Sequence, residues 1–145
     1  MLAVTLALVL GRDDPESARV SGVCRAAGTK PPFPAPGSRH PAQTFYTPRD
    51  EVPRDLTHGI THGYVVVTYD PGLPQSEQDA LAEWAVSADF VVVAPAENQD
   101  EAVRAVTARR TLGCTQVDLD SLTQFRDGWF DATDGGRRRS PPRRG

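Results

Sequence analysis

Gly63-Tyr-Val-Val-Val-Thr-Tyr-Asp-Pro-Gly72 is the run of residues that most clearly indicates how this chain folds. Its β-branched and aromatic residues predict a strand over 64–69, and the Asp-Pro-Gly sequence predicts the turn that ends it. The strand is almost continuously apolar, which is typical of a strand buried on both faces. We therefore expect other elements to cover it from both sides.

A helix and a second strand are predicted immediately downstream. Ser76 is a candidate N-cap for a helix over 76–88. Apolar residues recur there at the spacing of one helix face, at Leu81, Trp84, Ala85 and Ala88. The run Phe90-Val-Val-Val then predicts a strand over 90–94, closed by Pro95.

The next segment is ambiguous, and the last one predicts a helix. Residues 98–112 suit a helix as well as an alternating strand, and periodicity alone does not decide between them. Asp118 or Asp120 can cap a helix over 119–130. Its apolar face would consist of Leu122, Phe125, Trp129 and Phe130.

The expected architecture is an α+β domain, with a small mixed β-sheet packed against two or three helices and a proline-rich irregular N-terminal arm. The divisions we expect are an apolar segment over 1–11, a proline-rich linker or arm over 12–36, a globular domain over 37–131 and a disordered basic tail over 132–145. Prolines and other turn-formers continue to about residue 53, so regular structure is expected only beyond it.

Charge argues against nucleic-acid binding by the folded part. The chain has 16 Lys and Arg against 19 Asp and Glu. Five of the basic residues lie in the last nine, 137–145, so the remainder carries 11 basic and 19 acidic groups, a net charge of −8. An acidic surface repels phosphate backbones. The arginine tail could contact anionic lipid or nucleic acid, although such a tail is more often solvated.

The apolar run Met1–Leu10 bears on location. It is shorter than the roughly 20 residues that a membrane-spanning helix needs, and it lacks the positive region and cleavage site of a standard signal peptide. It could be a signal-like remnant, a buried strand, or the end of a spanning helix that begins upstream of Met1. The last interpretation is favoured and predicts an extracytoplasmic protein, membrane-anchored or secreted, with membrane association at its N-terminus.

Cys24 and Cys114 are the two cysteines of the chain. An even number of cysteines in an exported protein permits one disulfide. The alternative is a pair of unbonded, buried thiols that pack as small apolar side chains.

The candidate site is formed by the histidines of the chain, His40, His58 and His62. Three neutral imidazoles suffice to bind Cu or Zn and leave a further position open. His58 and His62 would share a face on a helix. However, glycine and β-branched neighbours make a helix unfavourable there, at Gly59, Ile60, Thr61 and Gly63. The alternative is that both imidazoles bond to backbone groups and fix a loop.

The run His58-Gly-Ile-Thr-His62-Gly-Tyr64-Val-Val-Val-Thr-Tyr69-Asp-Pro71 resembles the central motif of the bacterial DUF3105 family. That family has a His, three residues, His-Gly, an apolar strand and Tyr-x-Pro, after an upstream Pro-Pro and a small-residue turn that ends in a histidine. Pro31-Pro32 and Gly37-Ser38-Arg39-His40 are similar. The resemblance extends over about 40–130.

The resemblance implies a membrane-anchored protein and matches His40, His58 and His62 to the family's three histidines. It also favours a strand over about 103–109, and a proline-rich arm across one sheet edge would bring His40 toward the other two. This chain has Thr61 where the family usually has an acidic residue, and it lacks the family's tryptophan after the alternating strand.

Three functions are compatible with these observations. The first is an extracytoplasmic binding or interaction domain with a three-histidine Cu or Zn site and no enzymatic activity. The second is a small hydrolase or redox enzyme that uses His58 or His62 as acid or base beside Cys24 or Cys114. The third is an envelope scaffold without a small-molecule site.

Overall fold

The computed structural model describes residues 22–28, 41–54 and 56–134 of the 145-residue chain. Five strands form one mixed sheet in the order β1-β5-β4-β2-β3. In chain order these are β1 (Cys24–Gly28), β2 (Val65–Tyr69), β3 (Val91–Pro95), β4 (Val103–Val106) and β5 (Arg110–Cys114), with the helices α1 (His58–Thr61), α2 (Gln75–Ser87) and α3 (Leu119–Asp134). This confirms the α+β prediction.

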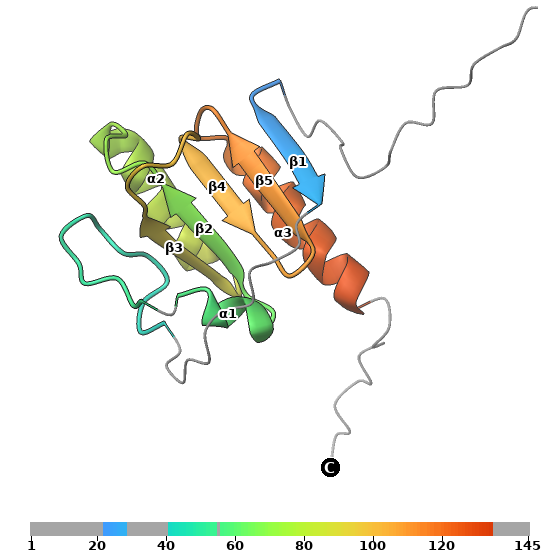
Figure 1. Cartoon of the computed structure of the whole chain (residues 1–145). Coiled ribbons are helices and arrows are strands. Elements are labelled where there is room, and N and C mark those ends of the chain that lie inside the picture. The colour runs from blue at the N-terminus through green and yellow to red at the C-terminus, as the bar shows by residue number, and fades with distance from the viewer. Residues whose placement is uncertain (1–21, 29–40, 55, 135–145) are drawn as a thin grey trace, which may run out of the picture.

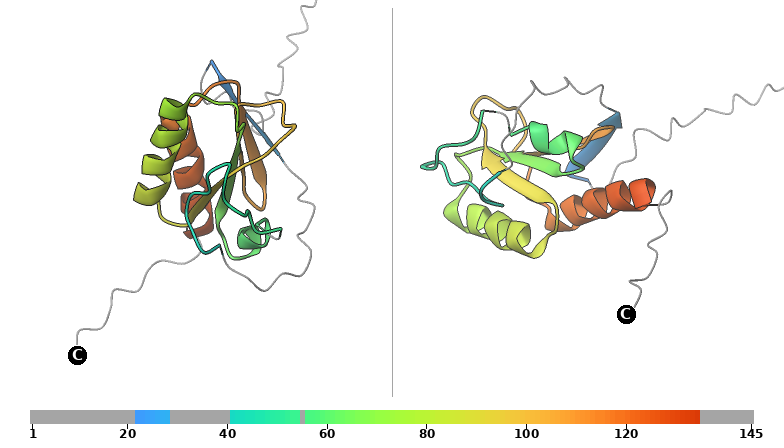
Figure 2. Two further views of the ribbon diagram at one scale, coloured as in Figure 1. Left: turned by 90° about the vertical axis from the view of Figure 1, so that its left-hand side faces the viewer. Right: turned by 90° about the horizontal axis from the view of Figure 1, so that it is seen from below.

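The helices divide between the two faces of the sheet. Figure 2 shows α2 and α3 side by side on one face, with the short α1 on the other. β2 and β3 are parallel neighbours joined through α2, whereas β4 and β5 form an antiparallel hairpin beside them. The domain is therefore a helical layer on a sheet whose second face is only partly covered by helix.

The core lies on both sides of β2. Alternate β2 residues, Val65, Val67 and Tyr69, face the α2 and α3 layer and are 0% exposed. Val66 faces the other way and packs with Ile60 of α1. The prediction of a strand buried on both faces is thus confirmed.

Tyr69 ties the core to the segment that precedes α1. Its hydroxyl donates to the Tyr46 carbonyl oxygen at 2.9 Å. Burial, reinforced by the charge of Asp50, raises the pKa of Tyr69 to about 12, so this phenol remains a neutral donor at physiological pH. Backbone bonds also join residues 44–46 to Val93, which covers part of the outer edge of β3.

Several predicted boundaries were wrong. The strand expected over 103–109 ends at Val106, because Thr107 turns the chain by bonding to Arg110 and starts the hairpin to β5. The helix expected to end at 130 continues to Asp134. Pro74, not Ser76, is the N-cap residue of α2. Asp118 caps α3, with its carboxylate accepting from the Ser121 amide at 3.0 Å.

β1 falls within the stretch in which no regular structure was expected. All five residues of β1 pair antiparallel with β5, and Cys24 lies opposite Cys114. The two form a disulfide across this register, 90 residues apart in sequence. Both cysteines of the chain are therefore bonded. Apart from Gly22 and Val23, the rest of the predicted proline-rich arm over 12–36 lies outside the described residues.

Candidate functional site

The two histidines of the central motif lie on α1, where a helix was not expected. That expectation was wrong, because packing favours a single helical turn over the local preferences of glycine and β-branched residues. Ile60 is 7% exposed and belongs to the apolar cluster on the second sheet face. A Cβ at Gly59 would lie 3.3 Å from the Tyr64 Cβ, so a residue without a side chain lets α1 approach the start of β2 closely.

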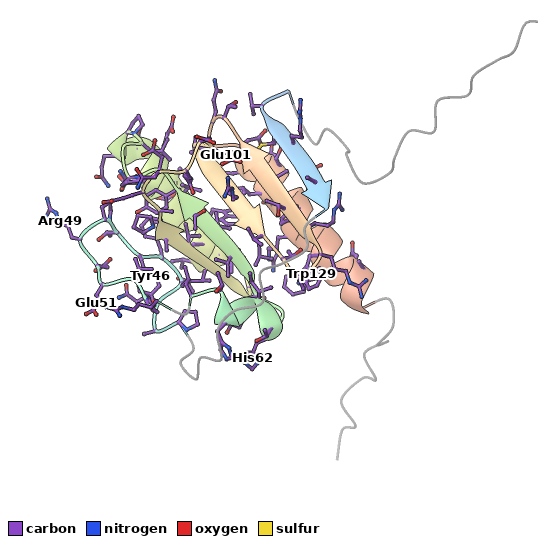
Figure 3. The ribbon with its side chains drawn as sticks, in the orientation of Figure 1. Tyr46, Arg49, Glu51, His62, Glu101 and Trp129 are labelled. Carbon is purple, nitrogen blue, oxygen red and sulfur yellow. A yellow bond between two sulfur atoms is a disulfide. The ribbon has the colours of Figure 1, made fainter. Side chains whose placement is uncertain are left out.

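The helical turn brings the imidazoles of His58 and His62 together. Their Nε2 atoms are 3.0 Å apart, and the rings meet edge to face with centroids at 4.7 Å. His62 is exposed and His58 is half-buried. Figure 3 shows His62 at the end of the molecule where β2 begins. The two nitrogens thus converge on one point that solvent can reach.

His40, the third predicted ligand, lies outside the described residues, so its position relative to the pair stays a prediction. Two residues later, the Ala42 amide donates to the Tyr46 hydroxyl at 3.1 Å. Tyr46 belongs to the same apolar cluster as Ile60 of α1. Over residues 22–28, 41–54 and 56–134, no three His, Cys, Asp or Glu side chains are grouped so as to hold a metal ion.

Aromatic side chains support the loop behind His62. Gly63 follows with φ of +87°, and its carbonyl oxygen accepts the Trp129 indole N–H at 3.1 Å. Tyr64 meets Phe90 edge to face, with ring centroids at 5.5 Å. Tyr64 and Trp129 are both partly buried, and Trp129, expected on the apolar face of its helix, packs against the core. Local sequence could not reveal this neighbourhood, since Trp129 lies 66 residues beyond Gly63.

The predicted histidine–thiol pair does not form. Cys24 and Cys114 are bonded to each other, and Cys114 lies opposite Val103, which in turn lies opposite Tyr69 at the end of β2. The histidines precede the start of β2. Five strand residues, about 17 Å, separate the two levels of the sheet, so neither sulfur is placed to act with an imidazole.

A cavity of about 680 Å³ opens on the second face of the sheet, and the sequence did not predict it. Ile60 of α1 and Thr57, the N-cap residue of α1, line one side, and the loop 96–101 lines another. Glu101 pairs with Arg104 there at 2.6 Å, while the buried Arg104 Nε has no hydrogen-bond partner. Neither His58 nor His62 lines this cavity.

Comparison with known proteins identifies a family that this chain matches. Residues 33–139 match the family model described as "Protein of unknown function (DUF3105)", and this range includes residues 40–130, over which the resemblance was expected to extend. Comparisons with curated proteins and with solved structures gave no match. In the part of the chain that the structure describes, no helix has the length and apolarity to cross a membrane.

Proposed function

This chain belongs to the DUF3105 family of proteins of unknown function, and we propose that it is an extracytoplasmic binding domain that holds a Cu or Zn ion through His58, His62 and His40. The observation that supports the proposal most directly is the 3.0 Å separation of the His58 and His62 Nε2 atoms. Imidazole nitrogens are ligands for both metals.

The separation of the two nitrogens favours copper over zinc. With metal–nitrogen bonds of about 2.0 Å, a 3.0 Å separation corresponds to an N–metal–N angle of about 95°. Tetragonal Cu(II) places neighbouring ligands near 90°, whereas tetrahedral Zn requires a wider angle. Small rotations of the rings would still admit zinc, so we expect both ions to bind and copper to bind more tightly.

His40 is the proposed third ligand because of where the chain enters the described part. Ala42 bonds to Tyr46, which packs beside α1. We therefore propose that His40, two residues before Ala42 in the sequence, completes the site. The open positions left by three imidazoles would take water or a partner's ligand.

Removing the histidine pair is expected to abolish stoichiometric metal binding. The full chain should bind about one Cu(II), more weakly Zn, and binding should weaken on acidification because protons compete for the imidazole nitrogens. The double variant His58→Ala/His62→Ala should lose stoichiometric metal binding. His40→Ala should lower the metal affinity about 10- to 100-fold. Isothermal titration and elemental analysis measure both.

Thr61→Ala is the matched control, because Thr61 lies on the same exposed turn and its hydroxyl donates to the His58 carbonyl oxygen, at 2.7 Å, not to an imidazole. This variant should bind metal like the wild type. Absence of binding to the folded wild type, or equal binding by the double variant, would contradict the proposal.

The disulfide supports the extracytoplasmic location. Bonds of this kind persist in oxidising compartments and are rare in the cytoplasm. We expect Cys24 and Cys114 to be bonded in protein taken from cells whose thiols were alkylated before lysis. A shift in mobility on reducing against non-reducing gels measures this, and full alkylation of both thiols in the native host would contradict the location.

A further inference from the structure

The cavity on the second face of the sheet has the size of a small-molecule site. Its volume is about 680 Å³, within the range of about 300–1,000 Å³ that is usual for sites that bind drug-sized ligands. It lies on the face opposite α2 and α3, and α1 covers this face only at the end where β2 begins (Figures 1 and 2). A ligand can therefore rest directly on the strands.

One part of the cavity floor is a mostly apolar row of side chains. Val66, Val106, Thr111 and Ala27 lie opposite one another on β2, β4, β5 and β1, so the row crosses four strands. All four line the cavity, and Ile60 of α1 lines it beside them. This row can take the apolar body of a ligand.

The next row along the same strands is polar. Thr68, Arg104 and Gly113 lie opposite one another there, two residues and about 7 Å from the apolar row. Glu101 accepts from the Arg104 Nη2 at 2.6 Å. A Cβ at Gly113 would lie 3.0 Å from the Glu101 Oε1, so the absence of a side chain at this position lets Glu101 lie against β5. The ion pair is thus seated on the sheet at the polar end of the cavity.

Hydrogen bonds within the protein hold the wall of the cavity in place. The Gln99 side-chain amide donates to the Glu101 carbonyl oxygen at 2.8 Å. The Ala96 amide donates to the Tyr69 carbonyl oxygen at 2.9 Å, which fixes the loop 96–101 to the end of β2. A ligand would therefore meet a site that is already formed, and little ordering would oppose its binding.

Arg104 has more donors than its ion pair uses. A guanidinium carries five N–H groups, and the bond to Glu101 takes one of them. The Arg104 side chain lines the cavity and is 41% exposed, yet its Nε is buried and has no acceptor among the described residues. A buried donor without an acceptor is unfavourable. A ligand oxygen that draws the guanidinium toward the cavity would satisfy it.

The charges of the lining favour an uncharged acceptor. Glu97, Asp100 and Glu101 line the cavity together with Arg104, so carboxylates outnumber the guanidinium. An anionic ligand would be repelled by this excess of negative charge, and a cationic group would be repelled by Arg104 at the polar end. A carbonyl oxygen avoids both repulsions, and its two lone pairs can accept from two N–H groups.

We propose that this cavity binds an uncharged, mostly apolar carbonyl compound, with the carbonyl oxygen on Arg104 and the apolar body over Val66 and Val106. The about 7 Å between the two rows sets the distance between these parts of the ligand. The site is separate from the proposed metal centre, because neither His58 nor His62 lines the cavity. The two proposals can therefore be tested independently.

A matched pair of dyes tests the proposal on the metal-free full chain. The first dye is the uncharged ethyl ester of diethylaminocoumarin carboxylic acid, and the second is the anionic free acid with the same ring system. The wild type should bind about one ester per chain. It should bind the acid at least about tenfold more weakly, because the lining repels a carboxylate. Fluorescence titration measures both affinities, and added salt should narrow the difference.

Arg104→Lys tests the polar end, because it keeps the positive charge but removes the planar set of guanidinium donors. The ester affinity should fall roughly tenfold. The urea midpoint should not fall, since the substitution also removes the buried Nε that has no acceptor in the described part. Arg25→Lys is the matched control, because Arg25 is exposed, lies opposite Gly113 and does not line the cavity. It should bind the ester like the wild type.

Val106→Trp tests the apolar row, because the larger side chain should fill the space above β4 and lower the ester affinity at least about tenfold. Gln124→Trp is its control, since Gln124 is exposed on α3, on the other face of the sheet. This control and His58→Ala/His62→Ala should both bind the ester like the wild type. Circular dichroism checks that each variant is folded.

Four results would overturn the proposal. The first is an absence of ester binding up to the solubility of the ester, and the second is equal affinity of the wild type for ester and acid. The third is wild-type ester affinity in both Arg104→Lys and Val106→Trp. The fourth is an equal loss of affinity in Gln124→Trp, which would place the bound dye outside the cavity.

Discussion

Replacing Cys24 and Cys114 together by alanine is expected to lower the free energy of unfolding by about 4 kcal/mol. The bond closes a loop with a sequence separation of 90 residues, and a cross-link over so long a loop removes much of the conformational entropy of the unfolded chain. Natural domains are stable by only about 5–15 kcal/mol. Urea denaturation of the variant and the wild type measures the loss.

Reduction of the wild type is the control for this prediction, because it removes the cross-link without changing the sequence. The reduced wild type and the double variant should unfold at similar urea concentrations, both well below the oxidised protein. β1 should separate from the sheet first, because it lies at the edge of the described sheet and pairs there with β5 alone. A decrease in the free energy of unfolding of less than about 1 kcal/mol would contradict this prediction. It would mean that the hydrogen bonds between β1 and β5 hold β1 in place without the covalent bond.

Trp84→Ala is expected to cost about 3–5 kcal/mol, the range for removal of a large aromatic side chain from a core. Trp84 is 9% exposed, and its indole N–H donates to the Thr123 hydroxyl at 3.0 Å. One side chain therefore fills the layer between helix and sheet and joins α2 to α3. Thermal and urea unfolding measure the change.

Trp84→Phe separates these two roles. Phenylalanine keeps most of the apolar area and lacks the donor, and the Thr123 hydroxyl still donates to the Leu119 carbonyl oxygen at 2.8 Å. This control should cost about 1 kcal/mol, the usual worth of one hydrogen bond. Equal losses for the two variants would show that the bond, and not the packing, joins the helices.

The elements that could be predicted from sequence are those with strong local patterns. β2 and β3 are runs of valine bounded by turn residues, and α2 carries apolar residues at helical spacing. β1 has no such pattern, because Cys-Arg-Ala-Ala-Gly is not strongly β-forming and it depends on β5 for its conformation. The β4–β5 hairpin was hidden because Thr107, not a glycine or proline, makes its turn.

At the candidate site, too, local sequence patterns could be recognised, whereas features that depend on contacts with distant residues could not. The spacing of His58 and His62 marked them as a pair, but only the structure shows that a single turn brings their nitrogens together. That turn exists because Ile60 is buried and Gly59 fits against Tyr64. Both contacts depend on the sheet, so propensity argued against the helix. The cavity escaped prediction because it combines elements that are distant in sequence.

The position of the disulfide also decides how the domain would respond to mechanical load. A pulling force applied through the residues before β1 enters at Cys24, the first residue of that strand, and passes through the covalent bond to Cys114, the last residue of β5. The hydrogen bonds of β1 therefore carry none of it. To detach β1, the load would also have to draw β5, which has neighbours on both sides, out of the sheet. A domain that is tethered through the residues before β1 would therefore resist extension at that point. Without the disulfide, the edge strand β1 would separate from β5 under the same force.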